Sequence, residues 1–339
     1  MSPKPIEFAV VGLGYWGPNL VRNVASCRRT RLAAMCDASP ARLEAVGDGF
    51  PAARRCTDPR VLFADASVDA VAIATPVGTH FALAEAALRA GKHVIVEKPM
   101  AASSAEAVKL VALAREAGRV LLVDHVFLYT PAVRKISDLF HSGDLGDVQF
   151  FDSVRINLGL FQHDVDVVWD LAPHDLAIID HLVGRAPMSV VAVGTAHTDS
   201  GLADTAYLHL DYGDRLLASV HVNWLSPVKV RHFMIGGTRR SVLYNDLDQS
   251  EKVKVFDRGI DVSKDPEGIR QVLISYRSGD VVSPRLEPTE ALRNLVEHFA
   301  DCIEGKSQPV SGGEQGLRVV RILEAAGKSM AAGGARVAL

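Results

Sequence analysis

The sequence predicts an α/β protein in two domains: an N-terminal domain with a parallel sheet, and a C-terminal α+β domain with a large, mostly antiparallel, open-faced sheet. Three observations support this prediction. The chain has 339 residues, more than one average domain. Short apolar strands alternate with helical stretches in the first third, which is typical of right-handed βαβ units. Longer stretches that alternate apolar and polar residues follow, so we place the domains at residues 1–122 and 123–339.

In the first domain, each expected strand is a short apolar run, and Ser, Pro or Gly marks the helix ends. Residues 6–11 form a continuous apolar run that ends in glycine, as buried parallel strands do. Ser39 followed by Pro40 is an N-cap with proline at the first helical position. The expected strands are 6–11, 31–36, 68–74, 93–96 and 120–123, and the expected helices are 17–25, 40 onwards, 80–90 and 103–117.

In the second domain, the expected strands alternate apolar and polar residues, as they do where one face of a sheet is covered. The clearest are TAYLHLDY, RLLASVHVNW and KVRHFMIGG, and a further strand is expected at about 148–157. Helices are expected at about 131–140 and 174–183, and again in the tail at 287–304 and 313–330. These elements together predict an α+β domain.

Composition excludes several classes of function. The sequence has 37 Lys and Arg residues and 40 Asp and Glu residues, which give a net charge of −3. Such a nearly neutral chain lacks the excess of positive charge that binding to nucleic acid or to an anionic membrane surface requires. No apolar run is as long as a membrane span, and the N-terminus meets glycine too early for a signal peptide. The cysteines Cys27, Cys36, Cys56 and Cys302 lack CxxC spacing and suit free thiols. We expect a cytoplasmic protein that acts on a small molecule.

The strongest motif is a GxGxxG turn, Gly12 to Gly17, between a predicted strand and a predicted helix. Asp37 follows the second strand at the interval expected for an acidic residue on the adenosine ribose. The glycines let the backbone approach a pyrophosphate at the helix N-terminus. We therefore expect a dinucleotide-binding Rossmann domain, with a chance glycine turn or a methyltransferase loop as alternatives. NAD is favoured over NADP because Asp37 repels a 2′-phosphate, although Arg42 nearby is able to bind one.

The second motif, Glu97-Lys98-Pro99, ends an apolar strand at the edge where open parallel sheets place their ligands. A lysine desolvated there is a usable proton partner, or a cation that stabilises a developing alkoxide. A surface lysine paired with Glu97 fits the spacing equally well. The proline also allows a cis bond after Lys98.

The third motif is Asp170-x-x-x-His174. Pro173 is tolerated in a first helical turn, so a helix is expected to begin close to 170–172. The positive helix end then favours a neutral imidazole at His174, which suits a general base that Asp170 orients. On the pattern alone, a capping aspartate beside a structural histidine is the more frequent arrangement. A metal site is a third option, and it would draw on His163, Asp164, Asp166, Asp170 and His174. Nothing in the pattern fixes a coordination geometry, so we expect no metal.

Weaker candidates lie elsewhere in both domains. Thr75, Pro76 and His80 follow a strand and suit the nicotinamide side of a cofactor site, although His80 equally suits an ordinary first turn of a helix. Polar or aromatic residues on predicted sheet strands suit an anionic substrate, and cross-strand packing explains them equally well. These are Arg155, Asn157, Trp224, Lys229 and Arg231.

Together these motifs resemble the Gfo/Idh/MocA family of nicotinamide-dependent oxidoreductases over essentially the whole chain. The shared segments are the glycine turn with Asp37, residues 74–76, 79–80, 90–94, 97–99 and 143–148, Asp-x-Ala-x-His at 170–174, and the helical tail. The resemblance implies a catalytic group of Lys98, Asp170 and His174. The cofactor contacts expected with it are Gly12, Gly14, Tyr15, Trp16, Gly17, Asp37, Arg42, Thr75, Pro76, His80, Glu97 and Lys98. The family often has glycine two residues after the aspartate, where this chain has Ala172, so we expect a different local backbone.

Two stretches, HVFLYTPAVRK at 125–135 and RINLGLFQ at 155–162, look like the branch of the family that acts on nucleotide-activated sugars. The resemblance implies hydride transfer at C3 of a sugar like UDP-N-acetylglucosamine, or of a dTDP-keto-deoxysugar. The substrate contacts expected with it are Lys98, Tyr129, Arg155, Asn157, Gln162, Asp170, His174 and Lys229. An inositol or free-polyol dehydrogenase is the alternative, followed by a non-catalytic NAD-binding regulator. The open sheet face predicts a homodimer or homotetramer.

Overall fold

The computed structural model describes residues 4–159, 161–263 and 273–339. Contacts between Cα atoms divide the chain into two compact units. Unit 1 contains the residues up to Thr130 together with Thr289–Glu324, and unit 2 contains Pro131–Pro288 together with Ala325–Leu339. Each unit is built around its own large sheet.

The sheet of unit 1 has six strands in the order β3-β2-β1-β4-β5-β6, and every neighbouring pair is parallel. The strands are β1 (Ile6–Val11), β2 (Thr30–Cys36), β3 (Arg54–Cys56), β4 (Ala70–Ile73), β5 (His93–Glu97) and β6 (Leu121–Asp124). The strand order reverses between β1 and β4, and ligands of such sheets bind at the carboxyl ends of the strands at this point. The predicted parallel sheet of a Rossmann domain is thus confirmed.

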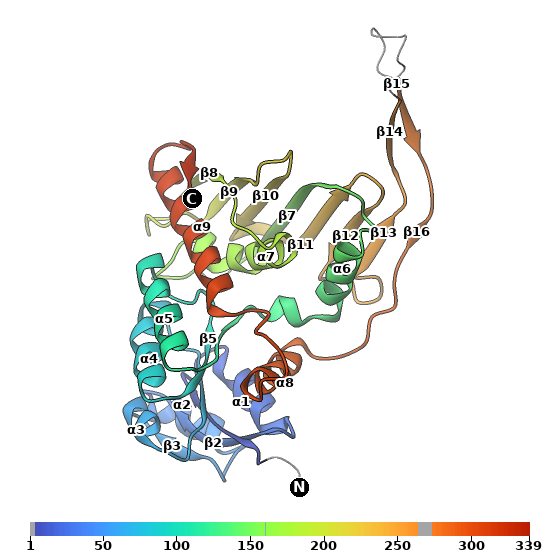
Figure 1. Ribbon diagram of the computed structural model, residues 1–339. Coiled ribbons are helices and arrows are strands. Elements are labelled where there is room, and N and C mark those ends of the chain that lie inside the picture. The colour runs from blue at the N-terminus through green and yellow to red at the C-terminus, as the bar shows by residue number, and fades with distance from the viewer. Residues whose placement is uncertain (1–3, 160, 264–272) are drawn as a thin grey trace. The chain divides into compact units, whose positions relative to one another are not determined.

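Helices cover both faces of this sheet. Figure 1 shows α4 and α5 on one face and α1 with α8 on the other. The helices are α1 (Gly17–Ser26), α2 (Pro40–Gly47), α3 (Pro59–Ala64), α4 (Val77–Arg89), α5 (Ser104–Glu116), the 3-10 helix η1 (Val126–Tyr129), α8 (Ala291–Ile303) and the first part of α9 (Gly313–Ala331). The predicted cap is present, because the Ser39 side chain accepts a hydrogen bond from the backbone of Arg42. Gly91 and Gly118 end α4 and α5 with positive φ angles of 74° and 60°.

The helix α8 belongs to unit 1 through apolar and ionic contacts. The rings of Phe299 on α8 and Phe8 on β1 have centroids 5.7 Å apart. Arg22 on α1 also donates a hydrogen bond of 2.6 Å to Glu290, the residue before α8. These contacts, rather than chain order, group residues 289–324 with the N-terminal sheet.

The sheet of unit 2 has nine strands in the order β16-β13-β12-β11-β7-β10-β9-β8-β17. Its pairings are antiparallel except for that of β7 with β10. The strands are β7 (Val148–Leu158), β8 (Ser189–Thr195), β9 (Thr205–Asp211), β10 (Leu217–Asn223), β11 (Leu225–Gly237), β12 (Ser241–Asn245), β13 (Val253–Phe256), β16 (Val281–Val282) and β17 (Val337–Ala338). β14 (Gly259–Ser263) pairs antiparallel with β15 (Leu273–Arg277) in a separate two-stranded sheet. The predicted, mostly antiparallel sheet is confirmed.

One face of the unit 2 sheet is covered by α7 (Val167–Val183), which packs on β7, β9 and β10, while α6 (Pro131–His141) packs beside α7 (Figure 1). Along β7 the side chains of Phe151, Ser153 and Arg155 are buried, whereas Phe150 before them and Asp152 between the first two are exposed. This alternation produces one covered face and one open face, as the sequence predicts.

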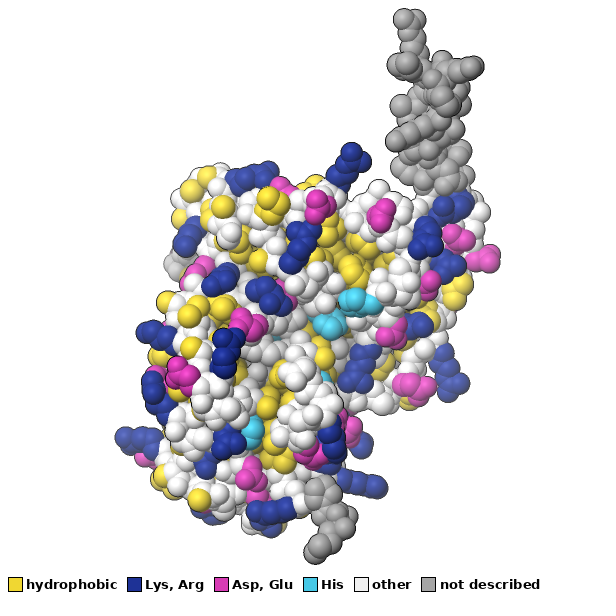
Figure 2. Space-filling model, viewed as in Figure 1, with side chains coloured by type: hydrophobic (Ala, Val, Ile, Leu, Met, Phe, Trp, Pro, Cys, Tyr) yellow, Lys and Arg dark blue, Asp and Glu magenta, His cyan; other side chains and the backbone are white. Residues whose placement is uncertain are grey.

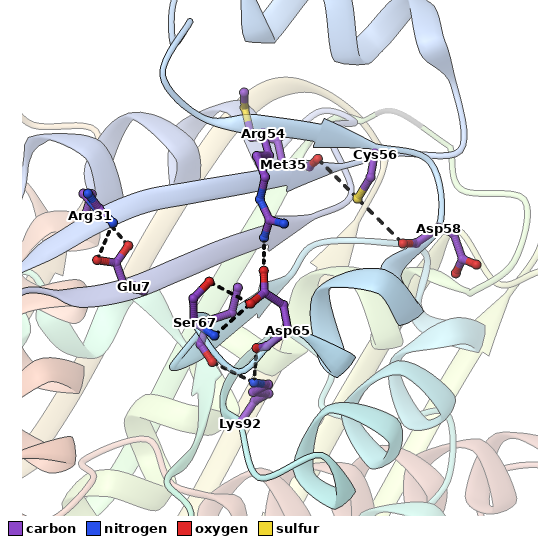
Figure 3. Close-up of polar contacts among 10 residues, drawn as sticks. Glu7, Arg31, Met35, Arg54, Cys56, Asp58, Asp65, Ser67 and Lys92 are labelled. Atoms are coloured by element: carbon purple, nitrogen blue, oxygen red, sulfur yellow. Dashed lines mark hydrogen bonds and ion pairs between the residues drawn. The ribbon is translucent and has the colours of Figure 1, made fainter.

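A network of polar contacts lies at the amino ends of β4 and β5 in unit 1 (Figure 3). The ammonium group of Lys92 is buried and donates to the carbonyl oxygens of Asp65 and Val68 at 2.6 and 2.8 Å. Hydrogen bonds from Ser67, together with Arg54, lower the pKa of the Asp65 carboxyl to about 2. The network lies beside the first residues of β4 and β5, at the edge of the sheet opposite the carboxyl ends of these strands.

The surface shows the mixed charge that the composition predicts. On the face drawn in Figure 2, Lys and Arg side chains are interspersed with Asp and Glu side chains. No described helix combines the length and apolar character that crossing a membrane requires.

Candidate cofactor and substrate sites

The three glycines of the turn after β1 have different structural surroundings. Gly12 has a φ of +92°, and a Cβ there would lie 2.5 Å from the carbonyl oxygen of Ala74. A Cβ on Gly17 would lie 1.9 Å from the carbonyl oxygen of Gly12, so this glycine lets α1 pack against the turn. A Cβ on Gly14 meets no atom within 4 Å. Gly12 and Gly17 therefore shape the turn, while Gly14 leaves room beside it, as pyrophosphate binding requires.

Asp37 connects the end of β2 to the glycine turn. Its Oδ2 atom accepts a hydrogen bond of 2.7 Å from the backbone of Leu13, and its Oδ1 atom accepts one of 2.8 Å from the backbone of Ser39. The guanidinium of Arg42, mostly exposed, lies 3.9 Å from the Asp37 carboxylate. The carboxylate thus stands beside the turn, where it suits a ribose with free hydroxyls better than one with a 2′-phosphate.

The other side of the turn contacts a pair of carboxyl groups, of which Asp124 is buried and Glu97 is half-buried. Glu97 and Asp124 are register partners at the carboxyl ends of β5 and β6. The indole nitrogen of Trp16 donates a hydrogen bond of 2.8 Å to Oδ2 of Asp124, while the neighbouring Tyr15 is 87% exposed. Burial raises the pKa of both carboxyls, and the negative charge of Asp124 raises that of Glu97 further. The turn, β5 and β6 are therefore joined at one point.

Lys98 follows this pair and is linked to Pro99 by a cis peptide bond. Its backbone N–H donates a hydrogen bond of 2.9 Å to the Glu97 carboxyl. Its charge also lowers the pKa values of Glu97 and Asp124. Burial, and then the Lys98 charge, lower the pKa of His125 to about 3, so this 1% exposed imidazole is neutral. The half-buried lysine thus has two carboxyls and a neutral histidine around it.

His80 ties the segment after β4 to the segment after Lys98. The side chain is 1% exposed, and its ring nitrogens lie 2.8 Å from the carbonyl oxygens of Thr75 and Pro99. The hydroxyl of Thr75 lies 2.6 Å from that of Thr79, and Pro76 is exposed at the start of α4. This helix begins at Val77, a turn before the predicted start at residue 80. His80 thus holds these two strand ends together, and cofactor contacts by Thr75, Pro76 and His80 stay predictions.

Tyr129 lies in the core of unit 1. It is 1% exposed, and its hydroxyl is 2.8 Å from that of Ser311, which donates to the carbonyl oxygen of Val123. Burial raises the pKa of the phenol. The structure thus gives Tyr129 internal partners, and its contact with a substrate stays a prediction.

In unit 2, the helix that carries Asp170 and His174 begins earlier than predicted. α7 starts at Val167 because Asp166 caps it, accepting hydrogen bonds of 3.0 Å from the backbones of Val168 and Trp169. Pro173 lies inside the helix, and the expected start at 170–172 is wrong. His174 is therefore two turns from the N-terminus, where the helix dipole acts only weakly.

Asp170 and His174 are four residues apart on α7 and share one face of it. The Asp170 carboxylate accepts a hydrogen bond of 3.1 Å from the indole nitrogen of Trp224, which is 1% exposed. The ring of Phe161 packs on this indole with centroids 5.4 Å apart, and a Cβ on Gly159 would lie 2.5 Å from it. The Asp170 carboxylate is thus held by Trp224, which directly follows β10, and His174, one turn further along α7, is half-buried.

The remaining predicted substrate residues of unit 2 differ in exposure. Arg155 is 4% exposed and makes two hydrogen bonds of 2.8 and 2.9 Å to the carboxylate of Asp175 on α7. Asn157 and Gln162 are half-buried, and Lys229 is exposed on β11. Arg155 thus joins the sheet to α7, and the substrate contacts of all four stay predictions.

Within the part of the chain that the structure describes, no group of three or more His, Cys, Asp or Glu side chains is arranged to hold a metal ion. Asp166, which the sequence offered as a metal ligand, serves as the cap of α7. Asp124 and His125 were not predicted as site residues. Their signal in the sequence is their place at the end of the strand next to that of Glu97, with Asp124 as its last residue and His125 directly after it.

Comparison with known proteins agrees with this geometry. Residues 6–125 match the model of an oxidoreductase family with an NAD-binding Rossmann fold, and residues 133–243 match the GFO/IDH/MocA C-terminal domain. The chain belongs to the GFO/IDH/MocA oxidoreductase family. Unit 1 contains its NAD-binding Rossmann domain, and the open space at Gly14 with the carboxylate of Asp37 fits that cofactor.

Relatives with several substrates align over most of the chain. UDP-N-acetylglucosamine 3-dehydrogenase of Acidithiobacillus ferrooxidans is 29% identical over 305 residues, 88% of this chain and 92% of the relative. Inositol 2-dehydrogenase of Rhizobium meliloti is 26% identical over 345 residues, 96% of this chain and 97% of the relative. A solved structure of UDP-N-acetylglucosamine 3-dehydrogenase GnnA from Acidithiobacillus ferrooxidans superposes with a TM-score of 0.82, at 25% identity, over 97% of this chain and 99% of that one.

Proposed function

We propose that this oxidoreductase transfers a hydride between NAD and C3 of a nucleotide-activated sugar, such as a UDP-N-acetylglucosamine-like sugar. The observation that supports this most is the similarity to UDP-N-acetylglucosamine 3-dehydrogenase, which extends over nearly the whole chain in sequence and in structure. The stretch Arg155–Gln162, which lies on and after β7, agrees with that branch of the family.

The proposed proton transfer uses Asp170 and His174. His174 accepts the proton of the sugar hydroxyl during oxidation and returns it during reduction. Asp170, on the same face of α7 and held by Trp224, orients the imidazole and stabilises its cation. This role of His174 rests on its carboxylate neighbour, because the helix end is too far away to favour the neutral form.

The proposed role of Lys98 is electrostatic. Its ammonium group stabilises negative charge that develops on the sugar oxygen. NAD, when bound, supplies the carbon that accepts or donates the hydride. Arg155, Asn157, Gln162 and Lys229 are the proposed contacts for the polar and anionic groups of the substrate.

A free polyol is the second candidate, and the similarity to inositol 2-dehydrogenase favours it. The two candidates differ in whether the substrate needs a nucleotide. Turnover of NAD with UDP-N-acetylglucosamine, with myo-inositol and with a free sugar separates them by absorbance at 340 nm. Turnover of inositol but of no nucleotide sugar would overturn the proposed substrate class.

The proposed residue roles are tested on the same assay with Lys98→Ala and His174→Ala. We expect each variant to lose at least about 100-fold in kcat, the usual contribution of a general base for His174 and of one electrostatic donor for Lys98, while calorimetry shows NAD binding close to wild type. Arg89→Ala is the control, because Arg89 is exposed on α4, pairs with Glu85 and takes no part in the proposed cofactor contacts or proton transfer. Near-normal kcat in both test variants would contradict these roles.

We also propose that the chain forms a homodimer or homotetramer through the open face of the unit 2 sheet. Strand register places several exposed apolar side chains on this face. They are Phe150, Val193, Tyr207, Leu217 and Met234. A hollow of about 490 Å³ on the sheet is lined partly by Phe150 and Leu217. Large apolar side chains exposed together on one sheet face are typical of interaction sites. Light scattering tests it: Leu217→Arg is expected to yield monomers, and a monomeric wild type would contradict the proposal.

The proposal includes a cytoplasmic location. The four cysteines are free thiols in the structure. Free thiols persist in reducing compartments.

A further inference from the structure

The indole of Trp224 makes a buried polar contact with α7. Trp224 directly follows β10, and its side chain is 1% exposed. An indole N–H is a donor only, so a buried tryptophan needs an acceptor for it. Here the acceptor is the Oδ2 atom of Asp170, at 3.1 Å. One oxygen of the carboxylate in the proposed proton-transfer pair is therefore bound by a side chain that follows a sheet strand.

The backbones on both sides of this hydrogen bond are tied to the same short segment before β9. The N–H of Trp224 donates a hydrogen bond of 2.9 Å to the carbonyl oxygen of Asp204. The N–H of Val167, the first residue of α7, donates one of 2.9 Å to the carbonyl oxygen of Ala203. Two consecutive carbonyl groups thus hold the start of α7 and the backbone of Trp224 at a fixed spacing.

The segment directly after β7 determines where the indole lies. The N–H of Gly159 donates a hydrogen bond of 2.9 Å to the carbonyl oxygen of Trp224, and the ring of Phe161 packs on the indole. A Cβ on Gly159 would lie 2.5 Å from Cδ1 of Trp224 and 3.0 Å from its Cγ. Cδ1 is the ring atom bonded to the donor nitrogen, so a side chain at position 159 would displace the donor from Asp170.

We propose that Trp224 and Gly159 are positioning residues for the proposed proton transfer. The indole holds one oxygen of Asp170 and leaves the other oxygen for His174, while Gly159 makes room for the indole. This inference rests on the proposed roles of Asp170 and His174, which lie four residues apart on one face of α7. Trp224 acts on the reaction only through Asp170, whichever compound is the substrate.

A double-mutant cycle tests this action, with kcat measured on the compound that the wild-type enzyme turns over. Trp224→Phe removes the N–H and keeps an aromatic ring. We expect it to lower kcat about tenfold and to change KM less than about twofold, because a hydrogen bond to a charged group is lost and the ring stays. In Asp170→Ala, itself at least about 100-fold slower than wild type, the indole has no carboxylate to hold. There we expect Trp224→Phe to change kcat less than about twofold.

Gly159→Ala displaces the donor instead of removing it, so it tests the same role in a chain that keeps Trp224. We expect the same pattern: kcat about tenfold lower on its own, and less than about twofold lower in Asp170→Ala. Trp169→Phe makes the matched aromatic change one residue before Asp170, where the side chain points about 100° away around the helix. Gly327→Ala adds a Cβ that meets nothing within 4 Å. Both controls are expected to keep kcat within about twofold of wild type.

A merely structural Trp224 would lower kcat by the same factor with and without the Asp170 carboxylate, and this additive result overturns the proposal. Wild-type kcat in Trp224→Phe overturns it as well. Melting temperatures show which variants are folded at the assay temperature, and the Gly159→Ala cycle decides the question if Trp224→Phe is not.

Failure of the proposed function gives a different result. Near-normal kcat in Asp170→Ala contradicts the proposed proton transfer itself, and with it any action of Trp224 through Asp170. Turnover of a free polyol in place of a nucleotide sugar overturns only the proposed substrate class, and the cycle is then measured with the polyol. An additive cycle beside a slow Asp170→Ala overturns the positioning role alone.

Discussion

Alanine substitutions at Gly14 and Gly17 are expected to have different effects: Gly17→Ala destabilises the fold, whereas Gly14→Ala weakens NAD binding. A Cβ at position 17 would lie 1.9 Å from the carbonyl oxygen of Gly12, which is backbone and has little freedom to move. Gly17→Ala is therefore expected to lower the free energy of unfolding by more than about 4 kcal/mol. A Cβ at position 14 meets nothing within 4 Å, so Gly14→Ala is expected to change stability by less than about 1 kcal/mol.

Gly14→Ala is expected to weaken NAD binding although it leaves the fold stable. The space beside Gly14 is where the backbone of such turns approaches a pyrophosphate, and a methyl group occupies it in Gly14→Ala. We expect the Kd of this well-folded variant for NAD to rise at least about tenfold, equivalent to about 1.4 kcal/mol. Urea unfolding without cofactor and calorimetry with NAD measure the two quantities on the same preparation.

The control substitution is Gly327→Ala, in α9, where a Cβ also meets nothing within 4 Å. It is expected to stabilise the helix by about 0.5–1 kcal/mol and to leave NAD binding unchanged. NAD binding by Gly14→Ala with wild-type affinity would refute the assignment of this turn as the pyrophosphate site.

Three further predictions follow from the buried polar groups. Asp175→Ala removes the carboxylate that accepts two hydrogen bonds from the buried guanidinium of Arg155, so thermal unfolding is expected to show a fall of about 3–5 kcal/mol in the free energy of unfolding; a fall of less than about 1 kcal/mol would contradict this. Asp37→Ala removes the carboxylate beside the turn, so calorimetry is expected to show the preference for NAD over NADP falling at least about tenfold. Burial lowers the pKa of His93 to about 4 and that of His125 to about 3, so both are neutral in the folded chain. Below about pH 6.5 the unfolded chain binds more protons, so the free energy of unfolding falls toward pH 4 by about 1.4 kcal/mol per pH unit for each histidine. His93→Gln is expected to reduce this slope in urea unfolding across pH, and an unchanged slope would contradict the argument.

The fold could be predicted because the local sequence signals for single elements and the order of the elements along the chain indicate the same architecture. The run Ile6–Val11, the glycine turn and the Ser39-Pro40 cap each specify one element, and alternation of strands and helices specifies the parallel sheet. The three-residue strand β3 was missed because a strand so short has no measurable period. The helix α3 was missed although Asp58 and Pro59 carry the same cap signal as Ser39 and Pro40.

Single residues of the candidate site could be predicted from the sequence, but the contacts between them could not. Sequence spacing located Asp37 and Lys98, because both follow buried strands. The start of α7 was misplaced because Pro173 was assigned to a first turn, whereas the capping strength of Asp166 extends the helix past it. The bond between Trp16 and Asp124 could not be predicted, since it joins residues 108 positions apart through the order of the strands.

The proposed function requires a substrate that carries a nucleotide. Calorimetric titration of the NADH-loaded protein with UDP-N-acetylglucosamine, with N-acetylglucosamine and with myo-inositol tests it directly. We predict that the UDP-sugar binds at least about tenfold more tightly than either free compound, a difference of about 1.4 kcal/mol. Binding of inositol without any response to the UDP-sugar would contradict the claim and would favour a free polyol as the substrate.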